Sequence, residues 1–344
     1  MVESIAVLGS GGWGTTLAVI LDEIGHDCRL WVRNPDEATE IERRRENARF
    51  LPGIPLSNSL RITADPAVAL AGAGLVLIAV PMASLAGNLR VFKPLLPVDA
   101  VVISAVKGIA VETGERVSEI AASILEPAVL ERWVTLSGPN LGREVAAREP
   151  TTTVIAGPDR AVTKRAQRAF SAAWFRAYTS DDLVGVELAG ALKNIVAIGA
   201  GMTDGMHLGH NAKAALMTRG LAEMTRLGIA AGANPLTFGG LAGVGDLIAT
   251  CESPQSRNHY VGEQLALGRS LDEITAHMDT VAEGIGTTSG AGVLARRLGV
   301  EMPITETMRA VLFAGLPVAE GMEQLMSREP VPELRGLDPE ARDG

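Results

Sequence analysis

The chain has 344 residues, of which 47% are hydrophobic and only 3% aromatic, so that aliphatic side chains must fill its cores. This length favours two domains over one. The formal net charge of −9 excludes non-specific nucleic-acid binding, which needs a basic surface, and it makes any anion site a local positive pocket in a negative protein.

The first half of the chain alternates short apolar strands with helices. Residues 4–8 (SIAVL) predict a strand, residues 9–14 a turn, residues 15–23 a helix and residues 28–32 a second strand. Further strands are predicted at 75–80, 101–104, 134–137, 153–156 and 176–179. Strands that alternate with helices predict a parallel sheet with helices on both of its faces.

Two segments of this half are candidate targeting or membrane segments. The chain enters its first strand almost at once, so we expect no signal peptide. Residues 71–92 are apolar, but their β-branched run and the proline that follows fit a buried strand and a helix. We therefore expect no membrane span.

After about residue 181 the strand signal disappears. Residues 182–200 and 211–229 predict long helices, and helical spacing continues to about residue 326. We predict an α/β domain over 1–184 and an all-helical substrate domain over 185–326. The polar, proline-bearing tail over 327–344 predicts disorder.

A dinucleotide-binding turn opens the chain. Gly9, Gly11 and Gly14 form GxGxxG between a predicted strand and a predicted helix, and Gly12 and Trp13 line the same loop. Such glycines allow the tight turn, the approach of a pyrophosphate and close helix–strand packing. The motif therefore predicts a nicotinamide dinucleotide site.

Arg33 follows the second predicted strand, at the position that decides which dinucleotide is preferred. An acidic residue there binds the ribose 2′-hydroxyl of NAD, whereas an arginine can pair with the 2′-phosphate of NADP. Arg33 therefore predicts a preference for NADPH over NADH, and the alternative is an ordinary surface arginine.

The segment GLAGVGDLIATCESPQSRN predicts a second anion site. Its glycine-rich turn leads to Asp246, and ten residues later Ser256, Arg257 and Asn258 supply hydroxyl, guanidinium and amide donors for a phosphate dianion. A helix that begins at Ser256 would add its free backbone amides. A dinucleotide turn and a separate phosphate site in one chain indicate a dehydrogenase that acts on a phosphorylated substrate.

Two lysines are predicted to take part in the chemistry. Lys193, beside Asn194, interrupts an apolar helix, and desolvation lowers a lysine pKa towards neutral pH, where the amine can transfer a proton. Asp246 is expected to orient it, and the alternative is a lysine whose amine reaches the surface. Lys107 follows a strand end, where it faces the nicotinamide cleft or solvent. No CxxC or His-x-x-x-His pair indicates a metal.

With these residues the chain resembles the bacterial-type NAD(P)-dependent glycerol-3-phosphate dehydrogenases over nearly its whole length. The resemblance rests on GSGGWGTTLA, LWVRNP, SAVKGI, SGPN, GVELAGALKNIVAIGAGMTDG, GLAGVGDLIATC, SRN, VAEG and GVEMPIT, in this order. It implies a Rossmann-type domain followed by an all-α domain like that of 6-phosphogluconate dehydrogenase. It also implies interconversion of dihydroxyacetone phosphate and sn-glycerol 3-phosphate for phospholipid synthesis, with NADP(H) or NAD(H), in a cytoplasmic homodimer.

The resemblance assigns roles to individual residues. Lys193 matches the family's proton acceptor, and we group Asp246, Lys107 and Asn194 with it as catalytic. The implied substrate contacts are Lys107, Gly138, Asn140, Lys193, Asp246, Ser256, Arg257 and Asn258. Besides the glycines of the turn, the implied cofactor contacts are Gly12, Trp13, Arg33, Lys107, Gly142, Arg257, Val281 and Glu283.

Residues 138–144 depart from the family pattern, because they read GPNLGRE where members commonly have GPSFAKE or GPTFAKE. Asn140 keeps a hydrogen-bonding side chain, so the substrate contact is expected to survive. Two other functions remain as alternatives: a regulator that senses NADPH without chemistry, and a related hydroxyacid dehydrogenase.

Overall fold

The structure is a computed structural model that describes residues 2–278, 280–333 and 335–337. The chain divides into two compact units, and each is described by itself. The first unit comprises Met1–Val106 and Val117–Leu183, and the second comprises Lys107–Arg116 and Val184–Gly344. Residues 107–116, which the sequence placed in the first domain, thus pack with the helical second unit.

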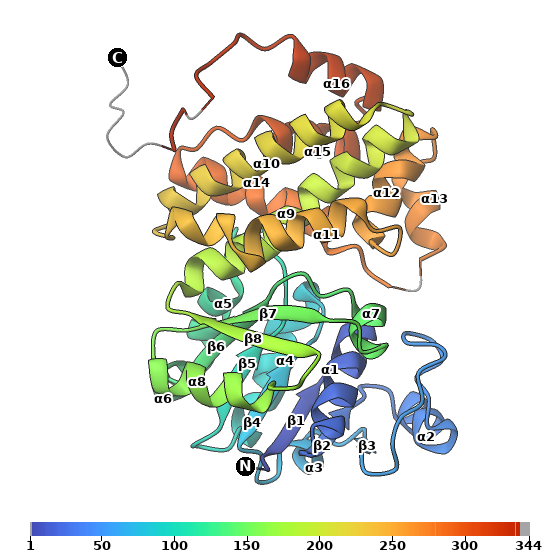
Figure 1. The fold of residues 1–344 in the computed structure, drawn as a ribbon, viewed down its shortest axis with the longest axis vertical. Helices are drawn as coiled ribbons and strands as arrows, with labels where there is room; N and C mark the ends of the chain where they lie inside the picture. Colours follow the sequence, from blue (N-terminus) through green and yellow to red (C-terminus); the bar gives the residue numbers. More distant parts are fainter. Residues whose placement is uncertain (1, 279, 334, 338–344) are drawn as a thin grey trace. The chain divides into compact units, whose positions relative to one another are not determined.

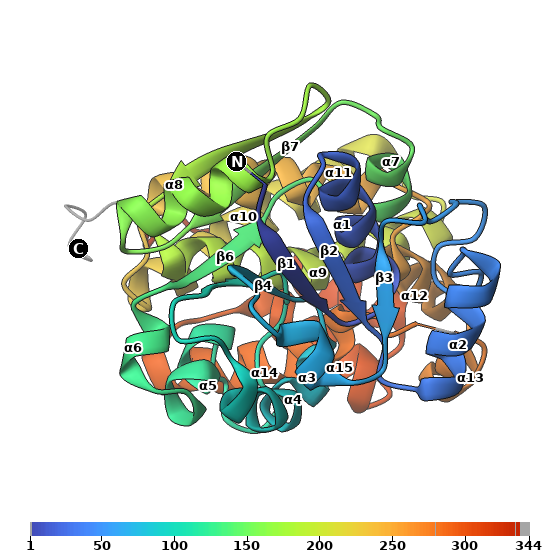
Figure 2. The same cartoon turned by 90° about the horizontal axis from the view of Figure 1, so that it is seen from below.

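The first unit is built on an eight-stranded sheet (Figures 1 and 2) with the order β3-β2-β1-β4-β5-β6-β7-β8. The first six positions repeat the strand order of dinucleotide-binding folds, and β7 and β8 extend that sheet. The strands are β1 Ser4–Leu8, β2 Asp27–Trp31, β3 Arg61–Thr63, β4 Leu75–Ile78, β5 Val101–Ser104, β6 Trp133–Ser137, β7 Thr151–Ala156 and β8 Phe175–Ser180.

Two features of the sheet differ from the sequence prediction. The sheet is parallel except between β6 and β7, which pair antiparallel with Leu136 opposite Ile155. The chain turns back after β6 through the single-turn helix α7 (Gly142–Ala146), which is too short to carry it back for a parallel strand. The prediction also missed β3, whose three residues include two polar ones.

Helices cover both faces of the sheet. Ile5, Leu30 and Leu77 point to the face on which α1, α7 and α8 pack, and together they form the main core cluster. On the opposite face Trp31 meets Phe92 of α4 edge-on, with the ring centroids 5.1 Å apart. The helices of this unit are α1 Gly12–Glu23, α2 Pro35–Arg44, α3 Pro66–Leu70, η1 Met82–Ser84, α4 Leu85–Phe92, η2 Lys93–Leu95, α5 Val117–Ile124, α6 Pro127–Leu130, α7 and α8 Arg160–Ala169.

All regular elements in the described residues of the second unit are helices. Its elements are α9 Leu183–Gly205, α10 His210–Ala230, η3 Pro235–Gly239, η4 Leu241–Gly245, α11 Asp246–Glu252, α12 Arg257–Ala266, α13 Leu271–Ala276, α14 Glu283–Leu298, α15 Pro303–Phe313 and α16 Val318–Met326. By length and composition α9 alone among the described helices is apolar enough to cross a membrane, but 89% of its apolar window is buried. It occupies the position of a core helix, as an element that is hydrophobic all round does.

Helices α9 and α12 cross at very short range. A Cβ atom on Gly201 of α9 would lie 1.9 Å from the carbonyl oxygen of His259, and one on Gly262 of α12 would lie 1.8 Å from that of Ile198. Only glycine allows two backbones to approach this closely. The contact fixes the start of α12, with Ser256 and Arg257, against the middle of α9.

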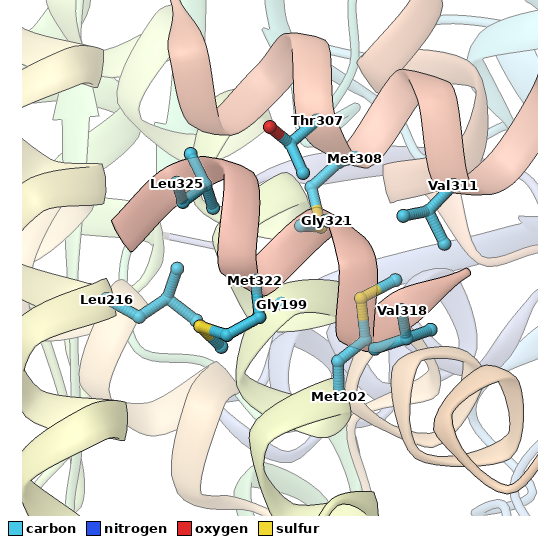
Figure 3. Close-up of a pocket in the computed structure, with 10 residues that line it drawn as sticks. All are labelled: Gly199, Met202, Leu216, Thr307, Met308, Val311, Val318, Gly321, Met322 and Leu325. Atoms are coloured by element: carbon cyan, nitrogen blue, oxygen red, sulfur yellow. The ribbon is translucent and has the colours of Figure 1, made fainter. Parts of the chain in front are cut away.

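A small apolar cavity of about 20 Å³ lies beneath α16. Figure 3 shows Met202, Met308, Met322 and Leu325 around it. Thr307 is the only hydroxyl in a lining that is otherwise apolar, whereas a buried water needs two to four polar partners. The cavity contains none of the predicted site residues, so we regard it as a packing void.

The predicted disordered tail is only partly described. Residues 327–333 and 335–337 follow α16 without forming a helix or strand, and residues 334 and 338–344 of the predicted tail lie outside the described residues.

A buried carboxylate joins α10 to the start of α15. Glu223 accepts hydrogen bonds from the backbone amides of Ile304 and Thr305, both at 2.8 Å, and from the Thr305 hydroxyl at 2.7 Å. Glu223 is 3% exposed. These contacts satisfy amides that a helix N-terminus would otherwise leave without partners.

We predict that Glu223→Gln lowers the free energy of unfolding by about 1–3 kcal/mol, because the glutamine amide turns a donor towards a backbone N–H that then lacks an acceptor. Urea unfolding followed by circular dichroism measures the change. Glu323→Gln on the exposed side of α16 is the matched control. Equal stability of the two variants would contradict the assigned cap.

Candidate active site

The glycine-rich turn has the geometry of a dinucleotide site. It joins β1 to α1, which begins at Gly12. Gly9 has φ +121°, and a Cβ atom on Gly14 would lie 2.0 Å from the Gly9 carbonyl oxygen. A Cβ atom on Gly11, in contrast, would meet nothing within 4 Å. The residues therefore fit a pyrophosphate placed against Gly11 and the first amides of α1.

Residues outside the motif hold this turn in place. Asn47, which is 2% exposed, donates from Nδ2 to the Ser10 carbonyl and to Thr15 Oγ1, both at 2.8 Å. The sequence analysis missed Asn47, because it lies 32 residues beyond Thr15 and no local pattern connects the two. On the other side Thr16 donates to the carbonyls of Gly12 and Gly142 at 2.9 and 3.2 Å.

Two more predicted cofactor contacts lie near this turn. Gly142 is next to it, and Arg33 follows the neighbouring strand β2. A Cβ atom on Gly142 would be 3.9 Å from both the Gly12 carbonyl and the Trp13 ring. Arg33 is exposed and comes two residues after Trp31, whose carbonyl accepts a hydrogen bond from the Gly9 amide. The first unit thus brings the predicted cofactor residues of the turn, Gly142 and Arg33 into one region.

The predicted substrate residues of the first unit lie between β6 and β7. Gly138 has φ +145°, a conformation that favours glycine. The Asn140 amide is tied to β7, because Nδ2 donates to the Thr152 carbonyl and Oδ1 accepts from the Thr153 hydroxyl, both at 2.9 Å. The departure from the family pattern at this position therefore gives an amide that is held by the sheet.

In the second unit a buried carboxylate binds two ammonium groups. Lys193 Nζ lies 2.9 Å from Asp246 Oδ1, and Lys107 Nζ lies 2.6 Å from Asp246 Oδ2. Lys193 also donates to the Thr250 hydroxyl at 2.5 Å, and that hydroxyl lies 3.2 Å from Asp246 Oδ1. The sequence analysis missed Thr250, although its position four residues after Asp246 puts it on the same face of α11.

Burial and charge set the protonation states of these groups. Desolvation lowers the pKa of Lys193 to about 8, although the attraction of Asp246 opposes that change. Desolvation raises the pKa of Asp246, but the two ammonium groups lower it by more, so that the net effect is a lowered pKa. At neutral pH the carboxylate is ionised, and Lys193 is placed to exchange a proton.

The start of α12 carries three of the predicted substrate contacts, Ser256, Arg257 and Asn258. Ser256 caps the helix by accepting a hydrogen bond from the His259 amide, and Arg257 is exposed at the first helical position. The helix has ten residues, and its first amides have no partner within the helix. This end of α12 therefore combines a guanidinium with the amides of Arg257 and Asn258, which the helix itself does not use, and this combination suits a phosphate.

Asn258, a predicted substrate contact, has both ends of its amide engaged within the unit. Nδ2 donates to Asn194 Oδ1 at 2.9 Å, and Oδ1 accepts the Gly284 amide at 2.9 Å. Asn194 and Asn258 thus connect α9 and α12 to the start of α14, where Glu283 lies. Val281, also a predicted cofactor contact, is 54% exposed just before α14.

The described residues contain no group of three or more His, Cys, Asp and Glu side chains that could hold a metal ion.

Comparison with known proteins decides the family. Residues 4–163 match the NAD-dependent glycerol-3-phosphate dehydrogenase N-terminus, and residues 182–323 match the corresponding C-terminus. The chain belongs to the NAD-dependent glycerol-3-phosphate dehydrogenase family. The resemblance that the sequence motifs predicted is confirmed.

Relatives of known name align over almost the whole chain. It is 49% identical over 328 residues to a glycerol-3-phosphate dehydrogenase [NAD(P)+] from Geobacter sp. strain M21, which covers 95% of this chain and 98% of the relative. It is 45% identical over 338 residues to the protein of that name from Moorella thermoacetica, with 98% and 100% covered.

A solved structure confirms the predicted fold class. The crystal structure of glycerol-3-phosphate dehydrogenase from Coxiella burnetii matches with a TM-score of 0.90 at 35% identity, and 95% of this chain and 99% of that chain are covered. A Rossmann-type domain followed by a helical domain is therefore the architecture of this family member.

Two glycine variants test the dinucleotide turn. We predict that Gly11→Ala leaves the melting temperature unchanged but weakens NADPH binding, because its methyl group enters the open space above the turn. Gly14→Ala should lower the melting temperature, because its Cβ clashes with the Gly9 carbonyl. Calorimetry and fluorescence titration measure the two effects. Unchanged NADPH affinity in Gly11→Ala would contradict a pyrophosphate at this position.

Proposed function

We propose that this chain reduces dihydroxyacetone phosphate to sn-glycerol 3-phosphate with NADPH or NADH, and that it catalyses the reverse reaction. The observation that carries the proposal is the buried Asp246 carboxylate between Lys193 and Lys107, in a member of this dehydrogenase family. Family membership over nearly the whole chain supports an oxidoreductase with a nicotinamide cofactor.

The phosphate of the substrate is proposed to bind at the start of α12. Arg257 and the free backbone amides there supply charged and neutral donors, and Ser256 adds a hydroxyl. Each hydrogen bond from the guanidinium to a phosphate oxygen is worth about 1.5–3 kcal/mol. Binding at this end of the substrate leaves its carbonyl free to meet the lysines.

Lys193 is proposed to handle the proton. When bound, the reduced nicotinamide supplies the hydride that the carbonyl carbon accepts. Lys193 donates a hydrogen bond and then a proton to the carbonyl oxygen, and in the reverse direction it accepts the hydroxyl proton. Asp246 orients the amine, and Lys107 adds positive charge where the oxygen becomes negative. Such fixed charge in a water-poor site is usually the largest contribution to catalysis.

The remaining assignments are parts of the same proposal. Gly138 and Asn140 are proposed to contact the substrate, and Gly142, Val281 and Glu283 the cofactor. By its family the chain is proposed to act as a cytoplasmic homodimer that makes glycerol 3-phosphate for phospholipid synthesis.

A sensor of NADPH without chemistry is not favoured, because it would have no need for a buried lysine–aspartate pair. A related hydroxyacid dehydrogenase is not favoured either, since the named relatives share one activity.

The proposal is tested by the loss of NADPH absorbance after addition of dihydroxyacetone phosphate. We expect rapid oxidation by the wild-type chain, and a rate that falls as the pH rises above about 8, because the ammonium form of Lys193 is lost. Lys193→Ala should abolish turnover and retain NADPH binding. Near-normal turnover in that variant would remove Lys193 from the mechanism, and no oxidation by the wild type would favour the sensor.

Arg33→Ala tests the cofactor preference. We expect the Michaelis constant for NADPH to rise more than that for NADH, because only NADPH carries the 2′-phosphate that an arginine can pair with. Steady-state rates with each cofactor give the two constants. Arg132→Ala serves as a control, because that arginine follows α6, before β6. An unchanged ratio in Arg33→Ala would assign Arg33 to the ordinary surface.

A further inference from the structure

The loop formed by residues 107–116 (the 107–116 loop) carries Lys107 and packs within the helical unit, although it directly follows the strand region of the first unit. It folds back on itself, because Ile109 and Arg116 form an antiparallel bridge and the Ala110 amide donates to the Glu115 carbonyl at 2.9 Å. Ile109 is 1% exposed. Lys107 and Arg116 are therefore the two ends of one compact loop.

The loop rests on α14 through glycine. A Cβ atom on Gly290 would lie 2.6 Å from the Ala110 carbonyl and 2.8 Å from that of Ile109. Gly114 has φ +69°, and a Cβ atom there would lie 2.8 Å from the Leu294 amide nitrogen. These contacts fix the position of the loop against the helix but do not hold its ends.

A buried ion pair fastens one end of the loop. Arg116 Nη1 lies 2.8 Å from Glu187 Oε2 of α9, and the two side chains are 15% and 2% exposed. An ionised carboxylate buried this deeply is stabilised by a charged partner. Glu187 lies six residues before Lys193, which is about 9 Å along the helix axis. Arg116 therefore ties the loop to the helix that carries the proton-transferring lysine.

We propose that Arg116 and Glu187 are positioning residues, which hold the 107–116 loop on α9 and so keep Lys107 in contact with Asp246. Arg116 acts through the bridge to Ile109, two residues beyond Lys107. In this way an ion pair distinct from the Lys107–Asp246–Lys193 group controls the arrangement of those charges. The proposal rests on the proposed function of Lys193.

Loss of this ion pair has a definite electrostatic consequence. The charged or titratable groups that act on Lys193 are Asp246, Lys107 and Cys251. Lys107 lowers the pKa of Lys193, because two positive charges share one carboxylate. If the loop no longer holds Lys107 against Asp246, the carboxylate interacts with Lys193 only, and the pKa of Lys193 rises.

The test uses the double variant Arg116→Gln/Glu187→Gln in the full chain, because a single change would leave a buried charge without its partner. We expect kcat/KM for dihydroxyacetone phosphate at pH 7 to fall about tenfold or more, as misplaced catalytic groups do. The pH above which this rate declines should move upward by about one unit. Arg116→Lys should keep the wild-type pH profile, because a lysine can still pair with Glu187.

Two controls separate positioning from stability and from the proposed function. Glu223→Gln lowers stability at a buried carboxylate distant in sequence from the loop, and it should leave the pH profile where it is. The pKa of Lys193 is also read without turnover, from the ¹⁵N resonance of its amine, assigned with Lys193→Met. An unchanged Lys193 pKa and an unchanged kcat/KM in the double variant would overturn the positioning role. If the wild-type chain is inactive but the double variant still has a shifted Lys193 pKa, the proposed function is overturned and the positioning role is retained.

Discussion

The pairing of the Asp246 carboxylate with two lysines is the interaction on which the rest of the helical unit depends. The carboxylate is buried at the start of α11 and binds the amines of Lys193 and Lys107 from two other parts of the chain. Burial of the Lys193 ammonium group would be costly without this carboxylate, and burial of the carboxylate would be costly without the two lysines. The three groups together carry one net positive charge, which can stabilise a negative charge that develops on an oxygen.

The surrounding structure brings these charges and the start of α12 together. Gly201 and Gly262 let α9 and α12 cross at backbone contact, which fixes Arg257 relative to Lys193. Asn258 connects the same two helices to α14 through both ends of its amide. The 107–116 loop adds Lys107 from a distant part of the sequence. Each of these contacts limits the motion of a functional group, which is how a fold places reactive atoms accurately.

Much of the fold was predictable, because periodicity and turn chemistry are local signals. The strand over 101–104 was predicted at its observed bounds, whereas the one predicted over 75–80 ends at Ile78, and α9 was predicted from its apolar run. The short polar strand β3 gave no such signal. The antiparallel pairing of β6 with β7 depends on the short connection through α7, which the sequence pattern did not reveal. In the site, Lys193 and Asp246 stood out as charges in apolar or glycine-rich surroundings, whereas Thr250 and Asn47 did not.

The sequence by itself determined the family, the fold class and the identity of the charged and glycine residues, since these depend on residue types and on spacing along the chain. Only the tertiary structure decided that Asp246 binds both lysines, that Asn47 supports the dinucleotide turn, and that residues 107–116 pack with the helical unit. These contacts join residues up to 139 positions apart. Such pairings depend on how whole helices pack, and no local pattern in the sequence records that packing.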